Sequence, residues 1–228
     1  MKAMQGRVAV VTGAGQGLGR AIARELAAAG HTVFGCGLVV DEPLEGVRLI
    51  ECDVTDEAQV QALWDQIIAE AGRIDWWVNN AGLALTGRPL AQMAGGEFER
   101  MVAINLVGTM TVCRVVIAGM TAQGFGEVWN MLGAGADGQP VRDMNGYATS
   151  KAGLTFMTRA LAQEAEGAVY KVGGFSPGLV MTEGFFREHA RVPAEQRAAR
   201  EAVVNLIGDH PETIATWIRE SLESGQDN

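Results

Sequence analysis

Short apolar runs alternate along the chain with longer segments in which apolar residues recur at helical spacing. Apolar runs without polar alternation are typical of strands that are buried on both faces of a parallel sheet. The longer segments then supply the helices that connect one parallel strand to the next. We therefore expect strands at Val8–Val11, Thr32–Gly35, Val47–Cys52, Ile74–Val78, Glu127–Met131 and Val169–Phe175.

The segments between these runs predict the helices of a doubly wound α/β domain. Asp53 and Thr55 provide N-cap chemistry ahead of Glu57, and Pro211 suits the first turn of a final helix. Because we find no repeat and no low-complexity linker, we expect one Rossmann-type domain of three layers that spans residues 1–228. The expected helices are Gly17–Ala29, Asp56–Ala71, Glu97–Met120, Tyr147–Glu164 and Pro211–Leu222.

Two stretches depart from a regular alternation of strands and helices. Only Leu38–Gly46 separates the second expected strand from the third. A crossover between parallel strands that contains a helix usually needs about a dozen residues, so we expect a loop there. After Leu222 the tail Ser224–Asn228 is polar, and we expect no further strand after the last helix.

Charge and composition exclude several classes of function. The formal net charge is −9, and an acidic surface repels nucleic-acid phosphates, so we expect no nucleic-acid partner. The three cysteines and three histidines lack the spacing of a disulfide framework or a metal site. The first strand begins at Val8, and no apolar run reaches the roughly 18 residues of a membrane span. We therefore expect a cytoplasmic protein with no signal peptide, metal or membrane attachment.

The chain has 30 glycines, and one cluster of them follows the first strand as Thr12-Gly-Ala-Gly-Gln-Gly-Leu-Gly19. Glycine lets the backbone turn and approach a phosphate closely, and the N-terminus of the following helix attracts that phosphate. Taken alone, the cluster could equally be a glycine-rich turn without a ligand. The candidate cofactor-binding residues here are Gly13, Gln16, Gly17, Leu18 and Gly19.

Further motifs follow the glycine cluster in a fixed order. They are Asp53-Val54, Asn79-Asn80-Ala81-Gly82, Asn105 in the long helix, Tyr147-x-x-x-Lys151, and Pro177-Gly178 followed by Thr182. In this order and spacing, residues 5–182 resemble the short-chain dehydrogenase/reductase family. The resemblance implies an NAD(P)-dependent oxidoreductase that moves a hydride between nicotinamide and a small-molecule carbonyl or alcohol.

Tyr147 and Lys151 are four residues apart and therefore share one face of the expected helix. A nearby ammonium group lowers the pKa of a tyrosine from about 10, which would make Tyr147 a usable general acid/base. The resemblance implies that Lys151 also holds the nicotinamide ribose and that Asn105 anchors a proton-relaying water. For Asn105 the alternative is a buried amide that links a helix to the sheet.

The resemblance also implies the remaining cofactor contacts. Asp53 would contact the adenine, although a carboxylate there is equally suited to cap a helix. Residues 183–210 would form a lid over the substrate or, alternatively, a solvated helical face, and residues 211–223 would form the C-terminal helix. The other implied cofactor contacts are Val54, Asn80, Ala81, Gly82, Tyr147, Lys151, Pro177, Gly178, Val180 and Thr182.

One residue of the family pattern is absent. The family carries a serine shortly before the tyrosine, and this chain has Ala134 in that place. The run at residues 133–138 is similar to the chlorophyll b reductase-like branch, whose serine would fall at Ala136. We expect an active but atypical reductase in which Ala136→Ser raises turnover. The alternative is a nucleotide-binding or regulatory protein that does little or no chemistry.

The choice between NAD and NADP depends on the end of the second strand. An acidic residue about 20 residues after the glycine loop selects NAD, but Gly37 and Leu38 provide neither that acid nor a basic residue for NADP. Asp41 and Glu42 make the adjoining loop acidic and would repel a 2′-phosphate. The sequence therefore favours NAD weakly over NADP.

Gly174-Phe-Ser-Pro-Gly178 matches the nucleophile elbow of hydrolases. That elbow needs a main-chain N–H directly after the serine, and Pro177 has none, so we exclude a hydrolase. The family resemblance further implies a homodimer that forms through helices 97–120 and 147–164.

Overall fold

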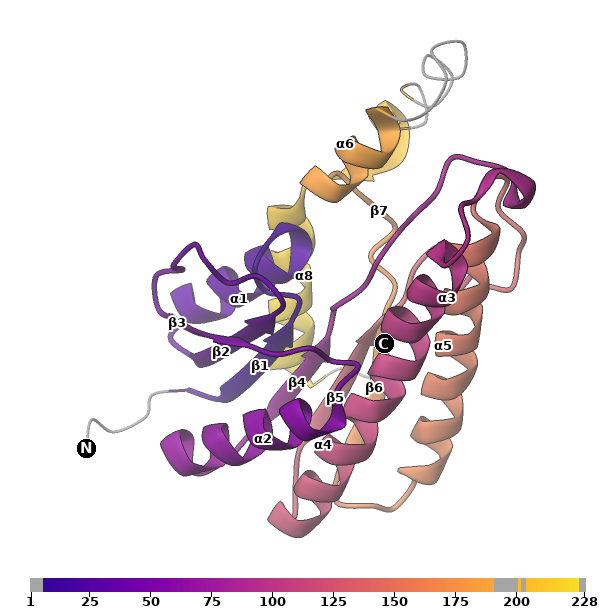
Figure 1. Ribbon diagram of the computed structural model, residues 1–228. Helices are drawn as coiled ribbons and strands as arrows, with labels where there is room; N and C mark the ends of the chain where they lie inside the picture. Colours follow the sequence, from indigo (N-terminus) through magenta and orange to yellow (C-terminus); the bar gives the residue numbers. More distant parts are fainter. Residues whose placement is uncertain (1–5, 191–200, 202–203, 226–228) are drawn as a thin grey trace.

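The computed structural model describes residues 6–190, 201 and 204–225, and its centre is a six-stranded parallel sheet (Figure 1). The strand order is β3-β2-β1-β4-β5-β6, so the chain runs outward from β1 and returns to the other side of β1 with β4. This reversal creates a switch point between β1 and β4. The strands are β1 (Val8–Thr12), β2 (Thr32–Gly37), β3 (Val47–Glu51), β4 (Trp76–Asn79), β5 (Glu127–Met131) and β6 (Lys171–Phe175).

Helices cover both faces of the sheet and give the molecule three layers (Figure 1). Val8 and Val10 of β1 belong to the core on the side of α2, α4 and α5, whereas Ala9 and Val11 belong to the core beneath α1 and α8. The expected doubly wound α/β fold is thereby confirmed. The helices of the two layers are α1 (Gly17–Ala28), α2 (Glu57–Ala71), α4 (Thr109–Gln123), α5 (Asn145–Glu164) and α8 (Pro211–Ser224).

The long apolar helix expected at residues 97–120 consists of three consecutive segments. They are α3 (Glu97–Val102), a π-helical segment (Ala103–Gly108) and α4, which ends at Gly124 with a φ of 90°. π-Helical insertions occur frequently at functional sites, and Asn105 lies within this one. Sequence periodicity does not reveal such an insertion, because the apolar face continues through it.

Two other element boundaries differ from the sequence expectation. β6 begins at Lys171, two residues later than expected, because Val169 is 51% exposed and lies outside the core. α5 begins at Asn145, so Tyr147 lies within its first turn instead of starting the helix.

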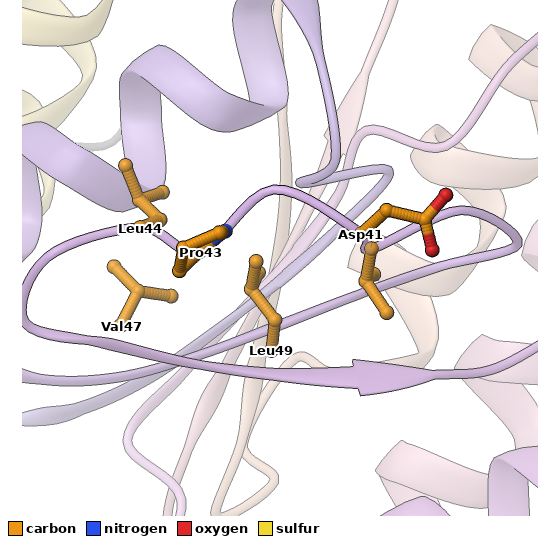
Figure 2. Close-up of a pocket in the computed structure, with 6 residues that line it drawn as sticks. Asp41, Pro43, Leu44, Val47 and Leu49 are labelled. Carbon is orange, nitrogen blue, oxygen red and sulfur yellow. The ribbon is translucent and has the colours of Figure 1, made fainter.

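The connection between β2 and β3 is a loop, as expected from its length. Arg20 of α1 holds it in place by donating hydrogen bonds to the main-chain oxygens of Glu42 (3.1 Å) and Pro43 (3.0 Å). Without a helix here, the loop and β3 enclose a pocket of about 250 Å³, which Figure 2 shows in close-up. Its lining residues are Val40, Asp41, Pro43, Leu44, Val47 and Leu49.

The C-terminal part adds a small second sheet beyond the main one. β7 (Leu179–Val180) pairs in parallel with β8 (Gly208–Asp209), and α6 (Glu183–Ala190) follows β7. Residues 191–200 and 202–203 of the expected lid region 183–210 lie outside the described residues. Within the described part of the chain no strand follows α8, and the main sheet ends at β6.

The helical run Glu97–Gln123 is long and apolar enough to cross a membrane by length and composition, and an 18-residue window within it has a mean hydropathy of 1.9. The expectation that no apolar run reaches the length of a membrane span is therefore wrong. Val112, Val116 and Met120 of α4 are nevertheless buried in the core of the domain, as in the core helix of a folded protein. The absence of a membrane partner and the cytoplasmic location stay predictions.

Candidate functional site

The carboxyl ends of β1 and β4 meet at the switch point, where Thr12 ties the following loops together. Its Oγ1 accepts hydrogen bonds from the main-chain N–H groups of Asn80 (3.0 Å) and Ala81 (2.9 Å). The Asn80 amide in turn donates to the main-chain oxygen of Thr12 (3.0 Å). Open α/β sheets bind ligands at this edge, so the glycine loop and the Asn80-Ala81-Gly82 motif are brought to one place.

The glycine loop is packed so closely that it needs glycine at three positions, and a Cβ at Gly15 would lie 2.1 Å from the main-chain oxygen of Val39. A Cβ at Gly13 would lie 2.9 Å from Ala81 Cα, and the φ of Gly13 is 68°. A Cβ at Gly19 would lie 2.3 Å from the main-chain oxygen of Gly13 and 2.4 Å from the Asn80 amide nitrogen. The backbone therefore makes a compact turn directly in front of α1.

The N-terminus of α1 is suited to a phosphate. Helix α1 starts at Gly17, its N-cap residue Gln16 makes no side-chain capping bond, and no acidic residue lies in the first turn. Unsatisfied N–H groups and the positive end of the helix dipole favour an anion at such a place. The residues present therefore fit the pyrophosphate of a dinucleotide. Leu18 is buried beneath the sheet, so its side chain belongs to the core.

Asp53 and Val54 lie further out, after β3. The Asp53 carboxylate accepts hydrogen bonds from the N–H (2.9 Å) and hydroxyl (2.7 Å) of Thr55. The N-cap of α2 is Asp56, which accepts from Ala58 N and Gln59 N, so the expected capping by Asp53 and Thr55 is wrong. Val54 is buried beside the π-helical segment, since a Cβ at Gly108 would lie 3.2 Å from its Cγ2.

Asn105 is completely buried, and its side-chain amide is fully engaged. Its Oδ1 accepts from the N–H of Leu83 (2.7 Å), and its Nδ2 donates to the main-chain oxygen of Leu83 (2.9 Å) and to Ser150 Oγ (3.0 Å). Asn105 thus links the loop after β4 to α5, as in the structural alternative considered from the sequence. Ser150 is a site residue that was not expected from the sequence; it precedes Lys151, and its hydroxyl donates to the Tyr147 carbonyl (2.7 Å).

Tyr147 and Lys151 lie on one face of α5, at the carboxyl end of β5. Lys151 Nζ lies 5.8 Å from the centre of the Tyr147 ring and donates to the main-chain oxygen of Met131 at 2.8 Å. A Cβ at Gly82 would lie 3.2 Å from Asn105 Oδ1 and 3.9 Å from Lys151 Nζ. The structure therefore brings Tyr147, Lys151, Asn105 and Gly82 together.

Burial perturbs both titratable groups of this pair. It raises the pKa of Tyr147 to about 12 and lowers the pKa of Lys151 to about 8. The pKa of Tyr147 therefore moves in the opposite direction from the sequence expectation, which considered the ammonium group but not burial. At neutral pH the phenol is protonated and Lys151 carries a positive charge.

The segment after β6 lies against the glycine loop. A Cβ at Gly17 would lie 3.4 Å from Thr182, whose hydroxyl accepts from the N–H of Phe185 (3.2 Å) at the start of α6. Pro177 and Gly178 lie between β6 and β7, and Val180 ends β7. The lid expected at residues 183–210 begins with α6, which is hydrogen-bonded to both sides of the site.

α6 makes one hydrogen bond to each of two loops. Arg187 donates to the Gln16 side-chain oxygen (3.3 Å), and the Glu188 carboxylate accepts from the N–H of Thr86 (3.2 Å). Gln16 belongs to the glycine loop, and Thr86 follows the Asn80-Ala81-Gly82 motif. The helix thus spans the site from one side to the other, an arrangement that sequence spacing could not predict.

Comparison with known proteins agrees with this geometry. A model of the short chain dehydrogenase family matches residues 7–191. The chain is 33% identical over 208 residues to L-fucose dehydrogenase from Oryctolagus cuniculus, an alignment that covers 87% of this chain and 72% of that protein. It is 30% identical over 231 residues to the chloroplastic chlorophyll(ide) b reductase NOL from Arabidopsis thaliana, covering 94% of this chain and 65% of that protein.

A solved structure of an actinorhodin polyketide ketoreductase with NADPH has a TM-score of 0.82 and 28% sequence identity. The alignment covers 99% of this chain and 93% of that one. The similarity therefore extends over the whole sheet and both helical layers, and it includes a protein whose structure holds a nicotinamide cofactor.

Proposed function

Because the chain belongs to the short-chain dehydrogenase family and is an oxidoreductase acting on CH–OH or C=O groups, we propose that Tyr147 is its general acid/base. The observation that carries this proposal is the half-buried Tyr147 next to the buried Lys151, beside Gly82 and Asn105. These residues lie at the same edge of the sheet as the glycine loop, which fits a dinucleotide pyrophosphate.

Different groups of the protein bind the cofactor and transfer the proton. A bound nicotinamide supplies or accepts the hydride. The main-chain N–H groups at the start of α1 hold the phosphates, and Gly13 and Gly19 allow the loop that precedes α1 to pack against Ala81 and Asn80. In reduction, Tyr147 Oη donates a proton to the substrate's carbonyl oxygen, and in oxidation it accepts the proton from the alcohol. The positive charge of Lys151 stabilises the tyrosinate that remains after donation.

The protonation state of Tyr147 suits the reduction step at neutral pH. Burial raises the pKa of Tyr147 to about 12, so the phenol holds its proton and can donate it to a carbonyl oxygen. Oxidation needs the tyrosinate instead, so its rate should rise with pH.

The test is oxidation of NADH and NADPH with a panel of aldehydes, ketones and aldoses. We expect Tyr147→Phe to lower kcat/KM by about 10²–10⁴-fold while the cofactor Kd stays unchanged. Tyr170→Phe, which removes the chain's other tyrosine, is the matched control and should retain full activity. Undiminished turnover in Tyr147→Phe would exclude Tyr147 as the acid/base.

One observation favours a second candidate, a nucleotide-binding protein that does little chemistry. No serine lies between residues 130 and 149, and the loss of one donor to a developing oxyanion costs about 10²–10³ in rate. This candidate predicts that NADH or NADPH binds, as measured by its fluorescence, without consumption on any carbonyl in the panel.

For the cofactor we propose NAD over NADP. The acidic residues Asp41 and Glu42 lie in the β2–β3 loop, and Arg20 is bonded to that loop's main chain. A titration of the protein with NADH and NADPH tests this choice, and tighter binding of NADPH would overturn it.

We also propose a homodimer formed through α4 and α5. Val107, Met110 and Phe156 lie on this pair of helical runs and are 51%, 51% and 77% exposed. Exposed apolar side chains gathered on two long helices are typical of an interface between subunits.

A further inference from the structure

Gly133 lies two residues after the end of β5, directly beside the Tyr147–Lys151 pair. A Cβ at Gly133 would lie 2.6 Å from Tyr147 Oη, 3.3 Å from Tyr147 Cζ and 3.4 Å from Lys151 Cγ. Real Cβ atoms essentially never approach another heavy atom within 3.0 Å. The phenol hydroxyl therefore occupies space that the Cβ of any other residue at position 133 would fill.

Space, and not backbone conformation, accounts for glycine at this position. Gly135 and Gly138 in the same loop have φ angles of 91° and 79°, which favour glycine for conformational reasons. Gly133 is absent from the positive-φ residues of the described chain, so a side chain there would not strain the backbone. Its neighbour Gly135 would bring a Cβ against Ala148 (2.7 Å from the main-chain oxygen) and not against Tyr147.

The serine that the family pattern places at Ala134, and that the chlorophyll b reductase-like branch places at Ala136, is absent from the turn that follows Gly133. In the structure the chain turns after Gly133, whose carbonyl accepts a hydrogen bond from the N–H of Ala136 (2.9 Å). Of the two glycines in this turn, Gly133 and Gly135, Gly133 is the one whose added Cβ would contact the Tyr147 hydroxyl.

We propose that Gly133 is a positioning residue for Tyr147: its missing side chain lets the phenol hydroxyl rest against the carboxyl end of β5. A side chain at position 133 displaces the hydroxyl from this place and exposes it to solvent. The inference rests on the proposed function only for its catalytic consequence, because the contact itself does not require that Tyr147 acts as the acid/base.

The first test follows the ionisation of Tyr147 directly. The chain has two tyrosines, so Tyr170→Phe leaves Tyr147 as the only source of a tyrosinate absorbance or a labelled ¹³Cζ NMR signal. In that background we expect Gly133→Ser to lower the pKa of Tyr147 from about 12 by about one unit or more, toward the value of about 10 for an exposed tyrosine. Ala136→Ser, which adds a hydroxyl three residues along the same loop, should leave the pKa unchanged.

A second test does not depend on a titration. Gly133→Ala and Tyr147→Phe form a double-mutant cycle, measured by urea unfolding. Removing the hydroxyl takes away the atom nearest to the added Cβ, so Gly133→Ala should lower the urea midpoint less in the Tyr147→Phe background than in the wild-type one. Gly133→Ala also serves as the smaller substitution if Gly133→Ser does not fold.

The two results together decide the inference. An unchanged pKa in Gly133→Ser, or an equal loss of stability in both backgrounds of the cycle, would overturn it. Neither measurement uses turnover. If the wild-type protein reduced no carbonyl but the pKa shift and the coupling were observed, the proposed function would fail and the role of Gly133 would stand.

Discussion

Lys151 Nζ donates a hydrogen bond of 2.8 Å to the main-chain oxygen of Met131, the last residue of β5. Lys151 is only 5% exposed, and this carbonyl is the hydrogen-bond acceptor that the structure provides for its ammonium group. A carbonyl dipole compensates only part of the cost of burying a charge. The relationship therefore explains why burial lowers the pKa of Lys151 to about 8.

This pKa predicts a pH dependence of stability. The folded protein gives up the Lys151 proton near pH 8, whereas the unfolded chain keeps it until about 10.5. Between these pH values the unfolded state binds more protons than the folded state, so the free energy of unfolding should rise as the pH increases. The stability gained in this way should be lost again as the pH falls through 8. Urea unfolding across this range should show the rise in the wild type. Lys151→Met should lack this component, and an identical slope in both proteins would contradict the prediction.

Gly19→Ala tests the close packing of the glycine loop. The added Cβ would meet the Gly13 carbonyl and the Asn80 amide, so either the loop or the β4 end must move. We expect a loss of about 1–3 kcal/mol in the free energy of unfolding, as for other overpacked sites. We also expect at least about a tenfold weaker Kd for the cofactor, because the loop's main chain no longer fits the phosphates.

The matched control for this substitution is Gly95→Ala. A Cβ there would meet nothing within 4 Å, and the φ of Gly95 is not positive. Calorimetric titration with NADH and NADPH should give wild-type affinity for the control. Wild-type affinity in Gly19→Ala as well would argue against phosphate binding at this loop.

The two hydrogen bonds of α6 predict that its attachment depends on both flanking loops. Arg187→Met removes the bond to Gln16, and Glu188→Ala removes the acceptor for the N–H of Thr86. Each surface bond contributes only about 0.5–1.5 kcal/mol, so we expect global stability to change little. Hydrogen exchange in α6 should nevertheless become faster by several-fold, because local opening costs less.

Arg187 also bears on cofactor choice, since it places a positive charge beside Gln16. If that charge contacts a cofactor phosphate, Arg187→Met should weaken cofactor binding and reduce its salt dependence. Arg24→Met, which removes an arginine paired with Glu212 on α8, is the control and should leave both unchanged. A loss for NADPH alone would indicate the 2′-phosphate, and equal losses for NADH and NADPH would indicate the pyrophosphate.

Phe156→Glu tests the proposed dimer. Phe156 is 77% exposed on α5, so a charge there should not disturb the fold of one subunit. In a dimer it would bury an unpaired carboxylate, which costs several kcal/mol and should dissociate the subunits. Light scattering at micromolar concentration should give a dimer for the wild type and a monomer for the variant. A monomeric wild type would exclude the interface outright.

The sheet could be predicted from sequence because its strands are apolar on both faces. Trp76 and Trp77 of β4 illustrate this, since they are buried in the cores on opposite faces of the sheet. The loop between β2 and β3 could be predicted because the segment is too short to contain a crossover helix. In contrast, Val169 is apolar but lies in a turn before β6, and composition does not distinguish a surface valine from a core one.

Parts of the candidate site depended on long-range packing and could not be predicted. The pKa of Tyr147 moves upward because of burial, and burial is a property of the folded chain. Sequence spacing does not reveal that Gly133 lies against the phenol, because that contact depends on how the end of β5 and α5 pack together. Arg187 is distant in sequence from Gln16, and only the path of the chain after β6 brings them together.

The amide of Asn105 joins three stretches that are far apart in sequence: the loop after β4 at Leu83, its own π-helical segment, and α5 at Ser150. Because Ser150 is bonded to the main chain of Tyr147, any displacement of the β4 loop reaches the phenol through a continuous chain of hydrogen bonds. The main chain at Tyr147 and the loop after β4 are thereby held in a fixed relation to each other. Substitutions that alter activity should therefore include residues that never contact the cofactor or the substrate.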